Sequence, residues 1–272
     1  MCHPIAPVRM IESLQGRLIF GRTTRIRSLE PGPHAGTTLT TPRRLARPDG
    51  AVLEGWSASP IDGRIEGTLL YFGGRNENAA WVAGMASFNP GWAIHAFNYR
   101  GFGASTGRAS ERRAKSDARA IHDAVAAGAA SARLAIVGRS LGTAIALALA
   151  HETRPARLVL MSPFESVPDV VRARPLGRLV AGFVTQRFAC ADLAAAHAGA
   201  TLVLLAEHDA SIPHARSRTL CARLPRPPAV HVVSGTTHQS LPRSSGAQAR
   251  IAEFLRPEPA VHFASTFIPR SS

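Results

Sequence analysis

The chain has 272 residues, a formal net charge of +14 at pH 7, and 45% hydrophobic residues. This length and apolar content predict a substantial buried core in one large domain or two small ones. No apolar run reaches the roughly 18–20 residues that a membrane-spanning helix needs, so we expect no integral membrane association.

The positive charge comes almost entirely from arginine, because Lys115 is the only lysine. A nucleic-acid-binding protein more typically shows a basic stripe with interleaved aromatic residues. Here the arginines are dispersed and only 6% of the residues are aromatic, so we expect no specific nucleic-acid partner. Loose association with an anionic surface stays open, and salt would weaken it.

The N-terminal residues and the cysteines bear on location. The first 15 residues contain no continuous apolar stretch, so no secretory signal is expected. Cys2, Cys190 and Cys221 are odd in number, far apart and without the spacing of a metal site. They indicate a reducing compartment, and we therefore expect a cytoplasmic protein with no metal site.

The first predicted elements form a hairpin. Residues 37–47 and 51–59 have the pattern of two strands, and Pro48, Asp49 and Gly50 between them are typical of a tight turn.

From residue 67 onward, predicted strands alternate with predicted helices. The strands are expected at residues 67–72, 92–99, 133–137, 156–161, 201–206 and 229–234. The helices are expected at residues 77–88, 110–127, 143–150, 214–224 and 246–255. This alternation implies parallel βαβ units, and the strands are apolar because helices cover both faces of such a sheet. We predict an α/β fold with a mostly parallel sheet and the hairpin paired antiparallel at one edge.

One helix has a distinct apolar face. In residues 110–127, Ala114, Ala118, Ile121 and Val125 recur at the spacing of an amphipathic helix. Ser110 is the expected N-cap, because its side chain can accept an unpaired backbone N–H.

The expected organisation has four parts. Residues 1–30 form an N-terminal segment, in which Leu18-Ile19-Phe20 is expected to pack. Residues 31–256 form the main domain, with an irregular insertion at about 162–200 that is expected to make a small helical cap. Residues 257–272 form a C-terminal tail.

Ser140 is the expected nucleophile. It lies in Gly138-Arg139-Ser140-Leu141-Gly142, between a predicted strand and a predicted helix. A Gly-x-Ser-x-Gly at a strand-to-helix turn is typical of the nucleophile elbow of serine hydrolases. The turn is so tight that only small side chains fit two positions either side of the serine.

A serine hydroxyl needs a base to take its proton, and the base needs an orienting acid. Asp209 is the expected acid, because it follows the strand at 201–206 directly. Glu165 is the stronger rival, since it also follows the end of a predicted strand. Glu207 is nearer to the strand and is expected to point elsewhere.

His238 is the expected base. It follows the last predicted strand, and Gly235 frees the intervening loop to fold over the edge of the sheet. His231 lies inside that strand and is expected to be a packed residue, while His262 lies in the tail. None of the histidines has a metal-ligand grouping.

An oxyanion hole needs two backbone donors where negative charge develops. One expected donor is the N–H of Leu141, the residue after the nucleophile. The other is the N–H of Arg75, in the loop Gly73-Gly74-Arg75-Asn76 that follows a predicted strand. The two glycines let this backbone approach a substrate.

The predicted cap supplies candidates for a substrate pocket. Its apolar candidates, together with Gly74 of the oxyanion loop, are Val167, Val170, Leu179, Phe183 and Phe188. An anionic substrate group is one role for nearby arginines, although a solvated helix face is the favoured interpretation of Arg172, Arg174, Arg178 and Arg187.

Together these motifs resemble the α/β-hydrolase superfamily, and most closely its small serine aminopeptidase-like members, from about residue 51 to residue 255. The stretches that carry the resemblance are residues 69–74, 98–107, 138–142, 162–164, 209–213 and 235–238. The resemblance implies an eight-stranded, mostly parallel sheet, no cofactor, and a triad of Ser140, Asp209 and His238. It favours Asp209 over Glu165.

The sequence departs from the superfamily pattern in two places. The family usually has His-Gly where this chain has Gly73-Gly74, and often has aspartate where this chain has Asn98. We expect a serine hydrolase that cleaves a small-molecule carboxylic ester. The alternatives are a thioesterase or peptidase on the same scaffold, a non-catalytic binding protein with a hydrolase fold, and a basic protein that binds nucleic acid or a surface.

Overall fold

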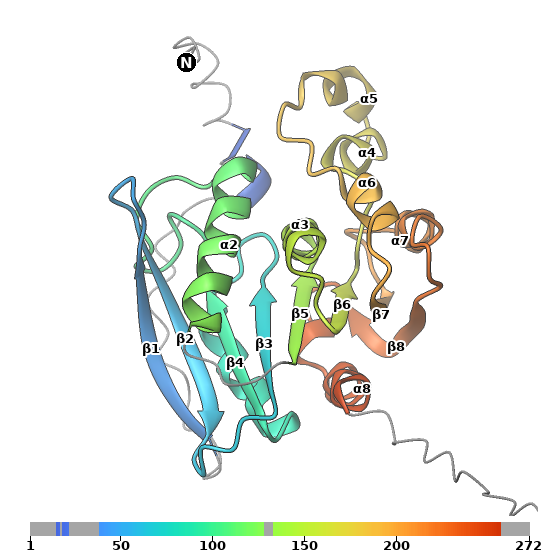
Figure 1. Cartoon of the computed structure of the whole chain (residues 1–272). Coiled ribbons are helices and arrows are strands. Elements are labelled where there is room, and N and C mark those ends of the chain that lie inside the picture. The colour runs from blue at the N-terminus through green and yellow to red at the C-terminus, as the bar shows by residue number, and fades with distance from the viewer. Residues whose placement is uncertain (1–14, 17, 22–37, 128–132, 257–272) are drawn as a thin grey trace, which may run out of the picture.

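An eight-stranded sheet runs through the computed structural model, which describes residues 15, 16, 18–21, 38–127 and 133–256 (Figure 1). The order of the strands across the sheet is β1-β2-β4-β3-β5-β6-β7-β8. β1 to β2 and β2 to β4 pair antiparallel, and every later pair is parallel. The strands are β1 Thr38–Ala46, β2 Val52–Pro60, β3 Gly67–Phe72, β4 Trp92–Phe97, β5 Leu134–Arg139, β6 Arg157–Met161, β7 Ala200–His208 and β8 Ala229–Thr237. The predicted α/β architecture, with its antiparallel hairpin at one edge, is confirmed.

Helices cover both faces of the sheet. One face carries α2 (Glu111–Ala126), α3 (Leu141–Thr153), α6 (Cys190–Ala195) and α7 (His214–Cys221), and the other carries the 3₁₀ helix η1 (Ala79–Phe88) and α8 (Ser245–Leu255). Successive side chains of a strand point to opposite faces. In β5, Ile136 therefore packs in the first layer and Val137 in the second, and both are fully buried.

The local signals explain most helix boundaries. Ser110 caps α2, because its hydroxyl accepts the backbone N–H of Arg113, and Ala114, Ala118 and Ile121 of the predicted face are buried. The helix expected at 77–88 is instead a 3₁₀ helix that begins at Ala79.

The later start has a physical cause. The Glu77 carboxylate is turned back to accept the N–H of Gly74. Asn78 then becomes the cap, with its side-chain oxygen accepting the N–H of Ala80. Glu77, which the predicted helix at 77–88 included, is therefore part of the preceding loop.

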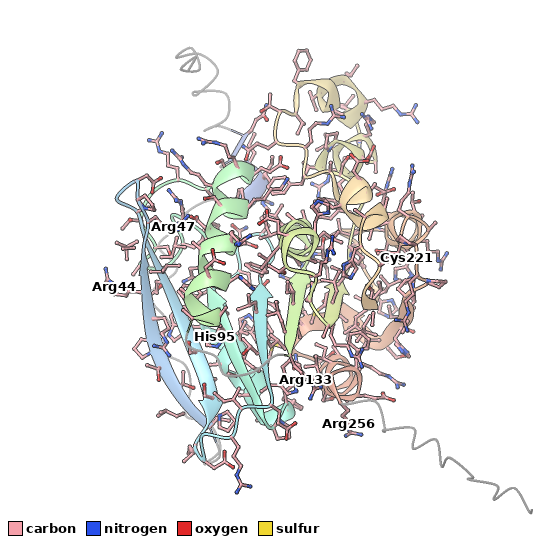
Figure 2. All side chains as sticks on the ribbon, viewed as in Figure 1. Arg44, Arg47, His95, Arg133, Cys221 and Arg256 are labelled. Carbon is pink, nitrogen blue, oxygen red and sulfur yellow. The ribbon has the colours of Figure 1, made fainter. Side chains whose placement is uncertain are left out.

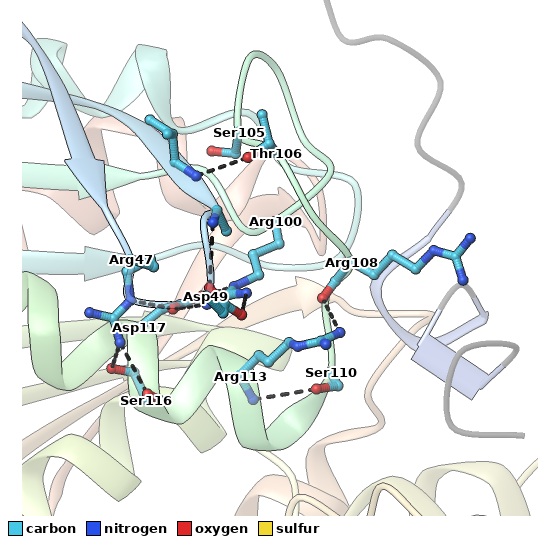
Figure 3. A network of polar contacts seen from close by, with 12 residues as sticks. Arg47, Asp49, Arg100, Ser105, Thr106, Arg108, Ser110, Arg113, Ser116 and Asp117 are labelled. Carbon is cyan, nitrogen blue, oxygen red and sulfur yellow. Dashed lines mark hydrogen bonds and ion pairs between the residues drawn. The ribbon is translucent and has the colours of Figure 1, made fainter. Parts of the chain in front are cut away.

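A buried ion-pair network fastens the hairpin to the rest of the fold (Figure 3). Arg100, in the loop after β4, donates to both carboxylate oxygens of Asp117 on α2, at 2.7 and 2.8 Å. It also pairs with Asp49 in the β1–β2 turn. Arg47 at the end of the same hairpin donates to Asp117 at 2.9 Å. One arginine thus joins three segments that are distant in sequence.

The predicted cap region between β6 and β7 contains short helices. They are α4 (Val167–Arg172), α5 (Gly177–Val180), the 3₁₀ helix η2 (Ala181–Phe183) and α6. Two backbone hydrogen bonds close its neck, from Val167 N to Arg187 O at 2.9 Å and from Ala191 N to Glu165 O at 3.1 Å. We call residues 167–187 the excursion. Its helices α4 and α5 stand beyond the carboxyl ends of the parallel strands (Figure 1).

Little of the two terminal segments is described. The tail at 257–272 and most of residues 1–30 lie outside the described residues. Phe20 is buried and packs edge-on against Tyr99 and Phe188, with ring centroids 5.3 and 5.8 Å apart, while Leu18 is 72% exposed. No helix in the described part of the chain is long and apolar enough to cross a membrane.

Arginines are spread over the molecule. Arg44 lies on β1, well apart from Arg133 and Arg256 (Figure 2). The last two lie near each other, because Arg133 donates to the backbone oxygen of Leu255.

Candidate active site

Ser140 occupies a tight turn between β5 and α3. Its backbone has φ +49° and ψ −117°, a left-handed conformation that costs energy for a residue with a side chain. A Cβ at Gly142 would lie 2.0 Å from the carbonyl oxygen of Phe72, and one at Gly138 would lie 2.6 Å from that of Gly142. Both glycines are therefore required by the close approach of neighbouring backbone.

Three side chains meet at this turn. The Nε2 atom of His238 lies 3.0 Å from Oγ of Ser140, and Nδ1 of the same ring lies 2.8 Å from Oδ2 of Asp209. Asp209 follows β7 and His238 follows β8, at the ends where parallel strands deliver their side chains to one edge of the sheet. The two hydrogen bonds form a continuous chain from carboxylate to hydroxyl.

Asp209 is fixed on both of its oxygens. Oδ2 faces His238, and Oδ1 accepts the backbone N–H groups of Ser211 and Ile212 at 2.9 and 2.8 Å. Its side chain is almost completely buried. Burial alone would raise the pKa of this carboxyl, but the hydrogen bonds from His238 and from the Ile212 backbone outweigh it and lower the pKa below the usual value. Asp209 is therefore ionised at neutral pH.

The rival residues have other partners. Glu165 pairs with Arg216 at 3.3 Å. Glu207 belongs to β7 itself, and its carboxylate accepts the N–H of Gly235 at 2.8 Å. His231 is half-buried within β8, and His262 lies outside the described residues.

A buried ion pair ties the elbow to its neighbouring loops. Nη1 of Arg139 lies 2.7 Å from Oε2 of Glu77, and Nη2 donates to the backbone oxygen of His238 at 2.7 Å. Oε2 of Glu77 also accepts the N–H of Gly74 at 2.6 Å. This pair therefore touches the loop of the nucleophile, the loop of the histidine and the predicted oxyanion loop.

The carboxylate of Glu77 accepts from two further donors. Its Oε1 receives the Tyr71 hydroxyl at 2.7 Å and the indole N–H of Trp81 at 2.9 Å. Burial disfavours the charge of Arg139, but the Glu77 carboxylate outweighs that effect and raises its pKa. Neither residue is predictable from the sequence as part of the site, since an acid after a glycine loop and an arginine beside the serine leave no periodic signal.

The two residues predicted to supply oxyanion donors, Leu141 and Arg75, line a cavity that Ser140 also lines. Leu141 is the first residue of α3, so its N–H lies at the end of the helix that carries partial positive charge. Arg75 lines the same cavity as Ser140, Leu141 and His238. The N–H of Gly74, the neighbouring donor, is already bonded to Glu77.

A cavity of about 1160 Å³ opens over Ser140. Three of the residues named as pocket candidates, Val167, Val170 and Phe183, line it. Leu179 is not part of the lining, because α5 turns its side chain to solvent with 72% exposed. Phe188 is buried in the core.

Gly74, the other predicted pocket residue, is buried in its loop and also lies outside the lining. Among the four arginines of the predicted cap, Arg174 lines the cavity, Arg172 pairs with Asp169, and Arg178 and Arg187 are exposed outside it. Within the described part of the chain, no group of three or more His, Cys, Asp or Glu side chains is placed to hold a metal ion.

Comparison with known sequences identifies the family. The family model described as serine aminopeptidase, S33, matches residues 63–193. An uncharacterized protein of Mycobacterium tuberculosis is 32% identical over 241 residues, which cover 85% of this chain and 83% of that protein.

The chain belongs to the α/β-hydrolase superfamily.

More distant similarities agree with this membership. Lysophosphatidylserine lipase ABHD12 of Gallus gallus is 37% identical over 90 residues, 31% of this α/β hydrolase and 24% of the lipase. The solved structure of acetyl xylan esterase 1 from Thermoanaerobacterium superposes with a TM-score of 0.66 at 16% identity, covering 94% of this chain and 98% of the esterase. At 16% identity, the similarity to this esterase supports the fold of the chain but not its activity.

One departure from the superfamily pattern has a clear reason. The Asn98 side chain accepts the N–H of Ala79 at 2.8 Å and donates to the carboxylate of Glu54 at 2.9 Å. An aspartate at this position could not donate to Glu54. The amide therefore suits the pair of neighbours that this α/β hydrolase provides.

Proposed function

We propose that this chain is a serine hydrolase that cleaves carboxylic esters through an acyl-enzyme intermediate. The observation that carries the proposal is the hydrogen-bonded chain from Asp209 through His238 to Ser140, at the base of a cavity. A serine in this arrangement loses its proton as it attacks, so the hydroxyl becomes an effective nucleophile.

The reaction follows from the positions of these atoms. Oγ of Ser140 attacks the ester carbonyl while Nε2 of His238 takes its proton. The Nδ1–H of the same ring donates to Asp209, which holds the imidazole in the required tautomer and stabilises its charged form. His238 then protonates the departing alcohol. A water molecule next attacks the acyl-enzyme while His238 takes its proton, and Ser140 leaves with that proton as the carboxylic acid is released.

The N–H groups of Leu141 and Arg75 bind the oxyanion in this proposal. The start of α3 supports the first, because a helix N-terminus favours negative charge. The Glu77 carboxylate supports the second indirectly, since it holds the preceding Gly74 in place. Removing one such donor typically costs about 2.7–4 kcal/mol of transition-state stabilisation.

The lining of the cavity suggests a substrate that carries an acyl chain and, near it, an anionic group. Val167, Val170 and Ile212 offer an apolar wall. Four arginines line the same space, of which Arg139 is paired with Glu77, and the other three are Arg75, Arg174 and Arg243. A partial similarity to a lysophosphatidylserine lipase is consistent with an anionic lipid ester. We therefore propose esters of medium or long acyl chains, with anionic headgroups preferred. A cytoplasmic location stays a prediction.

A fluorophosphonate probe tests the chemistry. The wild-type protein should be labelled, and Ser140→Ala should not be. Labelling of neither protein would favour a non-catalytic binding protein.

Three substrates that share one acyl group, as an ester, a thioester and an amide, then distinguish an esterase from a thioesterase or peptidase by their rates of hydrolysis. A series of acyl chain lengths maps the cavity. Faster turnover of acetyl than of longer esters would contradict the proposed acyl preference.

A further inference from the structure

The excursion ends in a cluster of apolar side chains that face solvent. Leu176, Leu179, Val180 and Phe183 are 79%, 72%, 54% and 77% exposed, and we call these four residues the apolar tip. They fall within eight consecutive positions at the part of the fold farthest beyond the sheet (Figure 1). A contiguous exposed apolar patch of this kind typically marks an interaction site.

The backbone holds the tip in this outward arrangement. Leu176 has φ +59°, a left-handed conformation that is unfavourable for leucine. Gly177 next to it is buried, and a Cβ there would lie 1.7 Å from the carbonyl oxygen of Val171. The segment is thus packed through its backbone. Leu176 and Leu179 face solvent, while Val180 and Phe183 are exposed at the border of the cavity. The two hydrogen bonds at the neck anchor the base of the excursion.

The excursion carries positive charge, close to the tip at Arg174 and Arg178 and at its neck at Arg187. Arg174, Arg178 and Arg187 are exposed, and none of them forms an ion pair with the described residues. The excursion contains one acidic residue, Asp169, which is already paired with Arg172. Exposed apolar side chains beside unpaired arginines match an anionic lipid surface, where acyl chains lie below phosphate groups.

Other occupants fit this surface less well. A second copy of the chain also carries a net charge of +14 and presents the same arginines, so two tips would repel each other. A nucleic acid would pair with the arginines but would leave the aliphatic side chains in water. An anionic lipid surface, which has an apolar layer beneath a charged layer, satisfies both features.

We propose that the apolar tip docks on an anionic lipid bilayer, with its side chains among the acyl chains and the three arginines at the headgroups. Val180 and Phe183 belong both to the tip and to the lining of the cavity over Ser140. Docking in this way turns the mouth of the cavity toward the bilayer. Membrane docking is a property beyond the proposed ester hydrolysis, and it does not depend on whether Ser140 reacts.

Vesicle sedimentation tests the proposal with the full-length protein. Wild type should bind vesicles of phosphatidylcholine mixed with phosphatidylglycerol, should bind pure phosphatidylcholine much less, and should be released by high salt. Leu176→Ser with Leu179→Ser should lower the partition coefficient by at least about tenfold, since each buried methylene contributes to transfer. Arg178→Gln with Arg187→Gln should lower it by about fivefold for each charge.

Matched controls lie at the opposite end of the sheet. Leu39, on β1, is 62% exposed, and Arg226, in the loop before β8, is also exposed. Leu39→Ser and Arg226→Gln should bind vesicles as wild type does. The tip and control variants should share one melting temperature and should hydrolyse a short soluble ester at the wild-type rate.

Three results would overturn the proposal. They are equal binding by the tip variants and wild type, equal binding of wild type to neutral and anionic vesicles, and a dimer in sedimentation velocity that Leu179→Ser dissociates. Because binding is measured without turnover, a protein that binds vesicles yet reacts with no ester would refute the proposed function alone.

Discussion

Replacing Arg139 with methionine should damage both the stability and the reactivity of the protein. The substitution keeps an unbranched, mostly aliphatic side chain and removes the guanidinium group with its charge. It leaves the Glu77 carboxylate buried, with its side chain only 6% exposed, and without its cation. Removing one partner of a buried ion pair typically costs about 3–5 kcal/mol, because the remaining charge is uncompensated.

The reactivity should fall for a separate reason. Nη2 of Arg139 holds the backbone oxygen of His238, and Nη1 holds the carboxylate that positions Gly74. Loss of both contacts frees the loops around Ser140, and a displacement of about 1 Å at a reacting group can cost about 10²-fold in rate. Arg139→Lys keeps the charge but cannot serve both partners with one ammonium group, so it should recover stability more fully than rate.

Two assays separate these effects. Urea unfolding gives the free energy of unfolding, and the second-order rate constant for fluorophosphonate labelling reports on Ser140. Arg250→Met is the matched control, because Arg250 forms an exposed pair with Glu253 that should contribute little. An unfolding free energy within 1 kcal/mol of wild type for Arg139→Met, together with unchanged labelling, would refute the positioning role of the pair.

The double variant with Glu77→Gln extends the test. Glu77 accepts from four donors, the side chain of Arg139, the backbone of Gly74, and the side chains of Tyr71 and Trp81. A glutamine has only one oxygen and so cannot satisfy all of them. The glutamine does remove the buried negative charge that Arg139→Met leaves unpaired. The double variant should therefore have a free energy of unfolding at least as large as that of Arg139→Met alone.

Three further outcomes follow from the geometry. Asp209→Asn should slow labelling by about 10⁴-fold. The asparagine oxygen stays with the Ser211 and Ile212 N–H groups, so its NH₂ group faces Nδ1 of His238 and forces the ring into the wrong tautomer. Labelling of this variant at the wild-type rate would contradict the role assigned to Asp209. Gly142→Ala should abolish fluorophosphonate labelling or folding, since its Cβ would lie 2.0 Å from the carbonyl oxygen of Phe72. Gly182→Ala is the control, because a Cβ there would have no heavy atom within 4 Å, and it should be labelled as wild type is. Burial, assisted by the charge of Arg43, lowers the pKa of His95 to about 4. Because a histidine in the unfolded chain titrates near 6.5, this contribution to the free energy of unfolding should be complete above that pH and should fall by about 3 kcal/mol as the pH drops to 4. Urea titrations in which His95→Asn keeps the full pH dependence of the wild type would refute this.

Regular periodic segments made much of the fold predictable. The strand at Gly67–Phe72 has the bounds that its apolar run predicts, and α2 begins at its serine cap. The meeting of Ser140, His238 and Asp209 was predictable in part, because each residue directly follows a strand and parallel strands deliver such residues to one edge. Strand ends alone left Glu165 as a second candidate for the acid, and only the family resemblance favoured Asp209.

Other features depend on contacts that no local pattern records. Glu77 and Arg139 are 62 positions apart, and their pairing depends on how two loops approach each other. In the excursion, α5 has four residues, too few for a helical period, so the sequence did not reveal that Leu179 faces solvent while Val170 lines the cavity.

The closed neck of the excursion makes it an exchangeable module. Chain enters and leaves it at Val167 and Arg187, which are joined by a backbone hydrogen bond that any residue except proline can donate. The nucleophile, the histidine and the aspartate all lie outside it. A related excursion of different length, grafted at these two points, should therefore change which molecules are admitted while leaving the reacting atoms where they are.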